Sequence, residues 1–356
     1  MPDWTASMQQ TFEYYIVDPG TWEDTKLIEN VISSSIDWDF TAKTLGSAVI
    51  NVSETVGEVY IRIYLITNQN GVKEKHPLGT FLVQTPSYSF DGKSKDISMD
   101  AYTPLLELNE KYPDIGFYVP EKSTIMEQAY ILAKNNMRAP VVKPSSTKEL
   151  HSNFVAETDS TWLTFLQELV AYDKYQFSLD EMGRIIFMPK QDTDALQPIW
   201  TYDDGNSSIL YPDIDLEQDL YGIPNVVEVI YSVNNVIYKS TAENNDVDSQ
   251  VSIQSRGRRI VHRDTDPSVT IVGSETEIQA QLDEYATALL KELSSLEYTI
   301  SYTHAYCPVR IGDCVRLNYE KAGLTNIKAR VISQSIECKP GCPVVEKAVF
   351  TNKLWR

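Results

Sequence analysis

Four cysteines near the carboxyl end of this 356-residue chain form its densest group of side chains that could do chemistry. They are Cys307, Cys314, Cys338 and Cys342, and His304 lies close by. Tetrahedral zinc sites favour short Cys-x-x-Cys knuckles, whereas the spacings here are six and three intervening residues. We interpret the four as buried or bystander thiols; the alternatives are a disulfide formed after release and a metal site.

One basic cluster interrupts the acidic background of the sequence. Its members are Arg256, Arg258, Arg259, His262 and Arg263. Guanidinium groups bind carboxylates through paired hydrogen bonds, so the four arginines are candidates for contact with an acidic partner or a neighbouring subunit. The interpretation that we favour is a solvated segment whose charges pair locally with Asp264 and Asp266. The aromatic interleaving typical of single-strand nucleic-acid binding is missing.

Catalytic patterns are missing from the sequence. The histidines form no His-Glu-x-x-His motif, and the chain has neither a Gly-x-Ser-x-Gly nucleophile elbow nor a Gly-x-x-x-x-Gly-Lys phosphate loop. Carboxylate pairs for sugar cleavage can always be proposed in a chain with 50 acidic residues, so they carry no weight. We predict a protein that is not an enzyme and uses no cofactor.

The charge of the chain restricts its partners. The 31 Lys and Arg against 50 Asp and Glu leave a net charge of −19, which repels nucleic acid over long range. This charge either keeps a large protein soluble or forms an acidic wall past which DNA slides. Asp215, Glu217 and Asp219 are candidates for such a wall. No apolar run reaches the roughly 18 residues of a membrane span, and no signal segment is visible, so we expect folding in the cytoplasm without stable membrane association.

Strands are the main elements that would position these groups. The run from Glu58 to Leu65 alternates polar and apolar side chains, as half-buried antiparallel strands do. Residues rich in Gly, Pro, Asn and Asp separate this run from its neighbours and predict turns. Residues 1–105 are therefore expected to form a first β domain, closed by a short helix over 103–109.

Residues 106–199 are predicted to form a small α/β middle domain. A capping box that begins at Thr124 predicts a helix to about Asn136. A second helix with one apolar stripe is expected after the capping candidates Asp159 and Ser160. A hairpin completes this domain.

Residues 200–232 and 300–356 are predicted to form a second β domain, into which a subdomain over 233–299 is inserted. The polar stretch 241–250 within the insertion is interpreted as a mobile loop. A capping box that begins at Ser274 predicts a helix with its apolar residues on one face. The fold class expected for the whole chain is α+β, a β-rich multidomain protein.

Three sets of short motifs together resemble a known family. They are Leu78–Val83 with Ser98–Leu106, Trp162–Leu166 with Tyr175–Phe177, and Pro308–Leu317 with Val331–Ile336. These motifs are similar to the first, second and last domains of the tail and baseplate hub proteins of phages, prophages and phage-derived tail particles, the late control protein D-like hubs. Each motif is short and structural, and the resemblance covers most of the chain.

The resemblance implies a homotrimeric hub in which each chain gives two tail-tube-like β-barrel domains. Three chains would present six such domains, join the sixfold tail tube to a threefold spike or tip, and line the tail channel. The implied partners are the chain itself, the tail tube or distal tail protein, the spike or tip protein and the tape measure protein, with DNA only in transit. The implied location is the tail of a virion or phage tail-like particle, after assembly in the bacterial cytoplasm.

Two functions of other classes are the alternatives to a structural hub. One is a tail-associated hydrolase that cuts the cell wall, which turnover of peptidoglycan would reveal. The other is a carbohydrate-binding β module, which glycan-dependent binding by a monomer would reveal.

Overall fold

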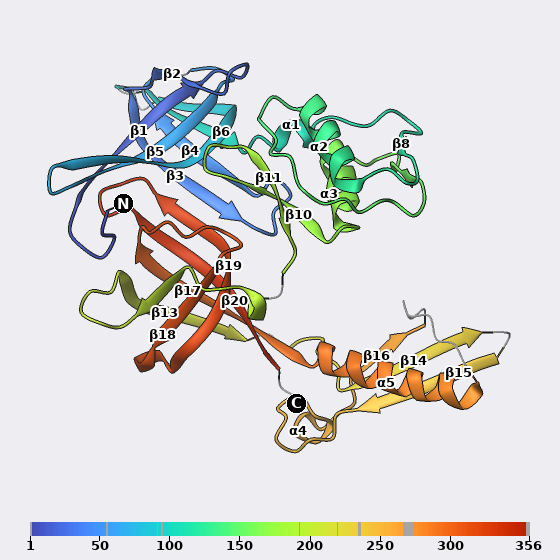
Figure 1. The fold of residues 1–356 in the computed structure, drawn as a ribbon. Helices are drawn as coiled ribbons and strands as arrows, with labels where there is room; N and C mark the ends of the chain where they lie inside the picture. Colours follow the sequence, from blue (N-terminus) through green and yellow to red (C-terminus); the bar gives the residue numbers. More distant parts are fainter. Residues whose placement is uncertain are drawn as a thin grey trace. The chain divides into compact units, whose positions relative to one another are not determined.

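A computed structural model describes residues 2–54, 56–90, 92–93, 95–191, 193–218, 220–233, 236–265 and 274–353 (Figure 1). The chain divides into two compact units. The first comprises residues 1–214 and 301–348, and the second comprises residues 215–300 and 349–356. No helix among the described residues has both the length and the apolarity needed to cross a bilayer.

The amino-terminal part of the first unit consists of paired antiparallel strands. Within the described residues these are β1 (Gln9–Val17), β2 (Asp24–Leu27), β3 (Val31–Asp39), β4 (Gly46–Val52), β5 (Tyr60–Gln69), β6 (Val72–Phe90) and β7 (Lys95–Tyr102). They are joined in the order β2-β1-β5-β6-β7-β4-β3. The short helix expected after them is α1 (Leu106–Asn109). Of the expected turns, the one at 91–92 includes Asp91, which lies outside the described residues.

Strand β5 is more deeply buried than its alternating sequence predicts. The side chains of Tyr60–Leu65 are all buried, including that of Arg62. The guanidinium donates hydrogen bonds to Asp24 (2.7 Å), to the hydroxyl of Thr80 (2.9 Å) and to the carbonyl oxygen of Met182 (3.2 Å). Both faces of β5 are therefore covered, and the polar position within it is paired rather than solvated.

Two helices and a hairpin form the middle of the first unit. The elements are β8 (Tyr118–Val119), α2 (Ile125–Asn136), β9 (Phe154–Val155), α3 (Trp162–Ala171), β10 (Tyr175–Leu179), β11 (Ile185–Pro189) and η1 (Thr193–Ala195). The two predicted helices and the hairpin are confirmed, but the helix caps differ from those expected at Thr124, Asp159 and Ser160. Thr124 makes no side-chain cap bond to α2. Helix α3 is capped by Thr161, which directly precedes its first turn and whose hydroxyl accepts from the N–H of Thr164 (3.3 Å).

The middle region shares an apolar core with the amino-terminal strands. Leu163 and Leu166 of α3 belong to the same buried cluster as Trp22, Tyr60 and Leu105. The indole of Trp22 also donates to a carbonyl oxygen in the turn between β10 and β11 (2.6 Å). This core makes the middle region part of the first compact unit.

The carboxyl-terminal part of the first unit is again a sheet. Its elements are β12 (Trp200–Asp203), β13 (Leu210–Gln218), β17 (Ser295–Ala305), β18 (Cys314–Tyr319), η2 (Glu320–Ala322), β19 (Leu324–Glu337) and β20 (Pro343–Lys353). By residue number, β13, β17 and β20 each continue into the second unit. Within the first unit these strands extend the same sheet as β1–β7.

The strand order contains a repeat that identical residues do not reveal. One run is β3-β4-β7-β6, with β5 beside β6; the other is β13-β17-β20-β19, with β18 beside β19. In both runs the strands follow the same order along the chain. Antiparallel pairing of β19 with β3 joins the runs and places Ile336 opposite Ile36.

The second unit contains a small sheet with a long helix on one face. Its elements are β14 (Val226–Val233), β15 (Val236–Glu243), α4 (Ile253–Arg256), β16 (Val261–Asp264) and α5 (Glu275–Leu293), with the sheet order β15-β14-β16. The predicted start of α5 is confirmed, because the N–H of Ser274 donates to the carboxylate of Glu277 (2.8 Å). Ile278, Leu282 and Leu290 pack against the sheet, as the apolar stripe predicts.

Part of the stretch interpreted as a mobile loop is a strand. Strand β15 continues to Glu243, and Asn244 and Ser249 after it are buried and bonded to each other (3.0 Å). These two buried polar residues therefore satisfy each other inside the unit. The finer division of the chain into four domains stays a prediction.

Gly183, in the turn between β10 and β11, tests how closely the hairpin approaches β6. Its φ is +74°, and a Cβ there would lie 2.7 Å from the Cβ of Thr80. We expect Gly183→Ala to lower the free energy of unfolding by about 2 kcal/mol or more, through backbone strain and overpacking. Gly71→Ala is the matched control, because Gly71 has a φ of +82° and no atom within 4 Å of the added Cβ. Chemical denaturation should show the control losing about 1 kcal/mol; equal losses would contradict the close contact.

Candidate functional site

One face of the sheet in the first unit is polar and open where the two strand runs meet. Glu337 of β19 lies opposite Ser35 of β3. Ser35 in turn lies opposite Val49 of β4, which lies opposite Asp100 of β7. Directly opposed residues project from the same side of a sheet, so these side chains share one surface.

Alternation along each strand extends this surface, which we call the acidic face. Its members on β19, β3, β4, β7 and β6 are exposed or half-buried: Ser33, Ser35, Asp37, Asp39, Ser47, Val49, Asn51, Thr85, Ser87, Ser89, Asp96, Ser98, Asp100, Tyr102, Ser333, Ser335 and Glu337. None of these described members is a Lys or Arg, and five are carboxylates. The alternate residues, such as Ile36, Ile50 and Met99, are buried in the core.

The acidic face continues over the second run of strands. Gln334 donates to the buried Glu346 (2.6 Å), so the intervening positions of β20, Val345 and Lys347, project from the opposite, acidic side. By the same alternation the face includes Ser301, Thr303, Ala305, Tyr211 and Asp213. Across the described part of the first unit, the face thus sets six carboxylates against one basic residue, Lys347.

The composition of the acidic face determines what it can do with a polyanion. Each Lys or Arg that contacts a phosphate adds affinity by releasing a counterion, whereas carboxylates repel the phosphate. Hydroxyl and amide groups keep the surface hydrated without adding charge. Lys339, which follows β19, is ion-paired with Glu337. The surface can therefore lie beside a nucleic acid without holding it.

A buried polar cluster lies directly behind the acidic face in the second run. Glu346 accepts hydrogen bonds from Gln334 and from the hydroxyl of Tyr302. His304 is fully buried; its Nδ1 lies 2.8 Å from the carbonyl oxygen of Ala305 and its Nε2 lies 3.4 Å from Glu346. Nε2 also lies 3.1 Å from the hydroxyl of Tyr202. The carbonyl oxygen at Nδ1 and the carboxylate at Nε2 both accept, which favours the doubly protonated ring, an imidazolium paired with Glu346.

The pKa values of the cluster follow from these contacts. Burial by itself lowers the pKa of His304, but its interactions with Cys307 and Glu346 outweigh burial and raise that pKa to about 10. Burial, together with the nearby Glu346, raises the pKa of Tyr302 and of Tyr202 well above the usual value. Both tyrosines therefore stay protonated. The network fixes the positions of β17, β19 and β20 relative to one another.

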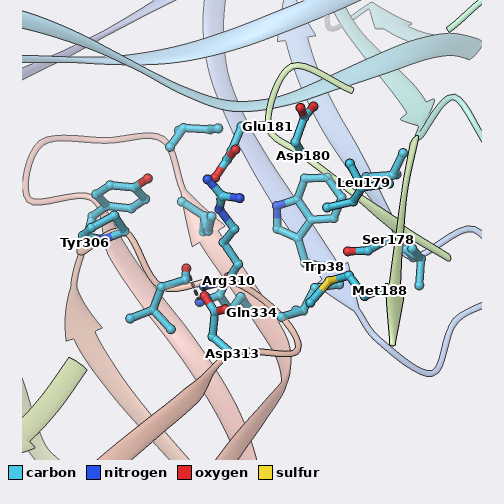
Figure 2. Close-up of a pocket in the computed structure, with 17 residues that line it drawn as sticks. Trp38, Ser178, Leu179, Asp180, Glu181, Met188, Tyr306, Arg310, Asp313 and Gln334 are labelled. Carbon is cyan, nitrogen blue, oxygen red and sulfur yellow. Dashed lines mark hydrogen bonds and ion pairs between the residues drawn. The ribbon is translucent and has the colours of Figure 1, made fainter. Parts of the chain in front are cut away.

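A cavity of about 200 Å³ lies between the two strand runs and the hairpin of the middle region (Figure 2). Trp38, Leu78 and Met188 are among its apolar lining residues. Arg310 forms an ion pair with Glu181, which links the segment after β17 to the hairpin (Figure 2). Burial raises the pKa of Glu181, and Arg310 opposes that shift. The cavity and its ion pair thus join three segments of the first unit.

The four cysteines are free thiols. Cys307, Cys314 and Cys342 are buried, and Cys338 is half-buried. Burial raises the pKa of Cys338 to about 11 and also raises that of Cys314 and Cys342, which disfavours the thiolate. In the part of the chain that the structure describes, no three His, Cys, Asp or Glu side chains are grouped to hold a metal ion. Bystander thiols, a later disulfide and a metal site all stay predictions.

The arginines of the basic cluster lie in the second unit and bond within it. Arg259 donates to Glu243 (2.5 Å), and Arg263 donates to Glu228 (2.7 Å). Arg256 donates to two carbonyl oxygens in the segment before β14, both at 2.9 Å. Glu243 and Glu228 lie on β15 and β14 and are not the neighbouring acids expected from the sequence.

The remaining members of the basic cluster, Arg258 and His262, are exposed. Asp264 accepts a hydrogen bond from the hydroxyl of Tyr285 (2.8 Å), and Asp266 lies outside the described residues. Contact of Arg256, Arg258, Arg259 and Arg263 with a partner stays a prediction.

Two of the three residues proposed from sequence for an acidic wall, Asp215 and Glu217, lie on β13 in the second unit and are exposed. Asp219 lies outside the described residues. Sequence reasoning missed the larger part of the acidic face, because the pairing of β19 with β3 is needed to bring its members together. The alternation of Ser and Asp along β3 was the available signal.

Comparison with solved structures finds phage tail proteins. A tail protein from Neisseria meningitidis MC58 matches with a TM-score of 0.65 and 13% sequence identity, over 97% of this chain and 98% of that chain. The 43 kDa tail protein of prophage MuSo2 from Shewanella oneidensis matches with a TM-score of 0.63 and 12% identity, over 95% and 98%. Prophage tail protein gp18 from Listeria monocytogenes EGD-e matches with a TM-score of 0.52 and 12% identity, over 96% and 95%.

These likenesses define the fold. No protein-family model matches the sequence, and a sequence search of curated proteins finds no match. Over nearly its whole length, however, the chain has the β-rich fold of phage tail proteins. The resemblance to phage tail proteins seen in the short motifs is thereby confirmed.

The pH dependence of unfolding tests the buried cluster. The pKa of His304 is near 6.5 when unfolded and about 10 when folded, so its contribution to stability is complete below pH 6.5. That contribution is lost as the pH rises from about 6.5 to about 10. We expect urea unfolding to show this loss in the native chain and a flatter profile in His304→Gln. Parallel profiles for the two chains would contradict a buried imidazolium.

Proposed function

We propose that this chain is a structural hub of a phage tail or a phage tail-like particle. Three copies form a ring, in which each chain fills two of six similar positions. The ring joins the sixfold tail tube to a threefold spike or tip and lines the tail channel. The fold shared with three tail proteins supports a structural role in a tail, and it favours a role without catalysis.

The repeated strand order supports two similar positions per chain. The runs β3-β4-β7-β6 and β13-β17-β20-β19 have the same order in space and along the chain. We propose that each run, with the strand beside it, belongs to one tail-tube-like β-barrel domain. Two such domains in one chain can occupy quasi-equivalent places, which lets a threefold ring contact a sixfold tube.

The acidic face is the observation that carries the proposal. It crosses the junction between the two runs and so presents one surface from both proposed domains. A channel that DNA traverses needs a wall without a ring of cations, because phosphate contacts slow passage. The acidic face meets that need, because it carries six carboxylates and only one basic residue, Lys347, among the described residues of the first unit. We propose that the acidic face lines the channel and that the middle region lies outside it.

The proposed partners follow from this position. They are the tail tube or distal tail protein on one side of the ring, the spike or tip protein on the other, and the tape measure protein within, with DNA only in transit. Assembly would take place in the bacterial cytoplasm. A cell-wall hydrolase would instead need two carboxylates that flank a bound sugar at roughly 5–10 Å, whereas those of the acidic face project side by side from one sheet. Glycan-dependent binding by a monomer would favour a carbohydrate-binding module.

The native mass of the purified chain tests the ring. A single chain would leave the ring-closing surfaces exposed, so we expect trimers or larger complexes at micromolar concentration. Native mass spectrometry should be run on the chain alone and with the tube and spike proteins of its particle. A species that stays monomeric under both conditions would rule out the hub.

Charge reversal on the acidic face tests the channel. The variant Asp37→Lys, Asp100→Lys, Ser335→Lys places three cations on that face, and Glu121→Lys, Asp159→Lys, Ser152→Lys makes the same charge change at exposed sites in the middle region. We expect the assembled first variant to retain duplex DNA, with log affinity falling against log salt by roughly 0.9 per phosphate contacted. The control and native rings should not retain DNA. Equal retention by the two variants would exclude the acidic face as the channel wall.

A further inference from the structure

The cavity of about 200 Å³ between the two strand runs and the β10–β11 hairpin, which we call the junction cavity, has the features of a binding site (Figure 2). Its lining comes from β3, β6, the hairpin, the segment between β17 and β18, and β19. All of these segments belong to the first unit. The junction cavity is therefore an internal feature of one compact unit.

Apolar side chains form most of the wall of the junction cavity. Leu78, Val309 and Ile336 are buried, and the rings of Trp38 and Tyr306 lie on opposite sides of the space (Figure 2). An apolar cavity of about 150 Å³ binds benzene, so about 200 Å³ accommodates one aromatic ring with roughly two or three further heavy atoms. The size of the cavity thus sets the size of its ligand.

Several polar groups of the wall have no partner in the protein. The hydroxyl groups of Ser178 and Tyr306 and the indole N–H of Trp38 make no hydrogen bond to a described residue. Ser178 is only 6% exposed, so bulk solvent does not satisfy its hydroxyl freely. Polar groups inside proteins are nearly always paired with protein or with ordered water. These three groups therefore indicate an occupant that carries polar atoms as well as an apolar body.

Asp313 gives the junction cavity an unbalanced negative charge. Its carboxylate accepts from the backbone N–H of Arg310 (2.9 Å), but it forms no ion pair with a described cation. The guanidinium of Arg310 is paired with Glu181, and Asp180 is paired with Arg184 (2.5 Å). Burial raises the pKa of Asp313, so this carboxylate is poorly hydrated. A cation placed beside it would restore the balance.

Size, apolar wall and charge together define one class of ligand. We propose that the junction cavity binds a small primary amine with one aromatic ring and a two-carbon chain, whose ammonium group donates to Asp313. The hydroxyl groups of Ser178 and Tyr306 can accept from the same ammonium. The indole N–H of Trp38 would favour an acceptor on the ligand, but the charge of Arg310 is already balanced by Glu181. The charge that remains is negative and selects a cation.

The ion pair between Arg310 and Glu181 marks the entrance to the junction cavity. The side chain of Arg310 is 52% exposed and that of Glu181 is 24% exposed, so the pair lies where the cavity meets solvent. The two residues come from different segments, and Figure 2 shows their side chains meeting across the space. A partly exposed ion pair contributes little stability, so it can open to admit a ligand at low cost.

Three probes of similar size and different charge test the site on the full chain. They are 2-phenylethylamine, 2-phenylethanol and phenylacetate, each titrated by ligand-observed NMR. We expect a dissociation constant on the order of 0.1–1 mM for the amine, as is usual for a well-fitted ligand of this size. The alcohol and phenylacetate should bind at least tenfold more weakly, because only the amine places a cation beside Asp313.

Three variants locate the binding. Asp313→Asn keeps an acceptor for the N–H of Arg310 but removes the charge, so the advantage of the amine over the alcohol should disappear. Ser178→Leu fills part of the cavity and should weaken both probes at least tenfold. Asp159→Asn makes the same charge change as Asp313→Asn at an exposed site in the middle region and should bind all three probes as the native chain does. Thermal unfolding of each variant confirms that it is folded.

Each other outcome overturns the proposal. A native chain that binds neither the amine nor the alcohol saturably has a cavity for water only. Binding of phenylacetate or the alcohol as tight as that of the amine would refute the role of Asp313, as would an advantage of the amine that survives Asp313→Asn. Amine binding unchanged by Ser178→Leu would place the ligand elsewhere. None of these results depends on the ring, whose native mass is a separate measurement.

Discussion

Antiparallel pairing of β19 with β3 is the constraint on which the rest of the first unit depends. It joins residues from opposite ends of the chain, and it makes two strand runs into one sheet. Each side of that sheet then takes a different role. On the core side, Ile336 meets Ile36 and both are buried; on the open side, the same register sets Glu337 beside Ser35. A slip by one residue would exchange the two sides, so the buried apolar pair protects the placement of the acidic face.

Buried charges hold the parts of this sheet in place. Glu346 and His304 lie behind the second run, and Arg62 connects the first run to the turn after β10. A buried ion pair adds little net stability, because desolvation offsets most of the attraction, but removing one partner is costly. Buried ion pairs therefore disfavour alternative packings of the strands, in which one partner would be left unpaired, more than they raise the stability of the native packing. That property fixes the position of the acidic face on the sheet.

Local sequence patterns predicted the helices and strands, whereas contacts between residues far apart in the sequence determine which of their faces are buried. Helix α5 could be read from its capping box and apolar stripe, since both depend on residues a few positions apart. The burial of both faces of β5 could not be predicted, because Arg62 donates a hydrogen bond to the carbonyl oxygen of Met182, which is distant in the sequence. The partners of Arg259 and Arg263 likewise come from other strands. The motifs indicated the fold of tail proteins, but the strand repeat depends on the pairings within each run, and the joining of its acidic residues into one face depends on the β19–β3 register.

The acidic face also limits how the sheet can be extended. Carboxylates gathered on one surface repel one another, and at physiological ionic strength this repulsion is screened beyond about 8 Å. Along β3, Asp37 and Asp39 lie directly opposite serines, namely Ser335 and Ser47 for Asp37 and Ser333 for Asp39. No carboxylate there lies directly opposite another, which lowers the cost of placing them on the face. A surface built in this way needs no cations to balance it, and so keeps its repulsion for phosphate.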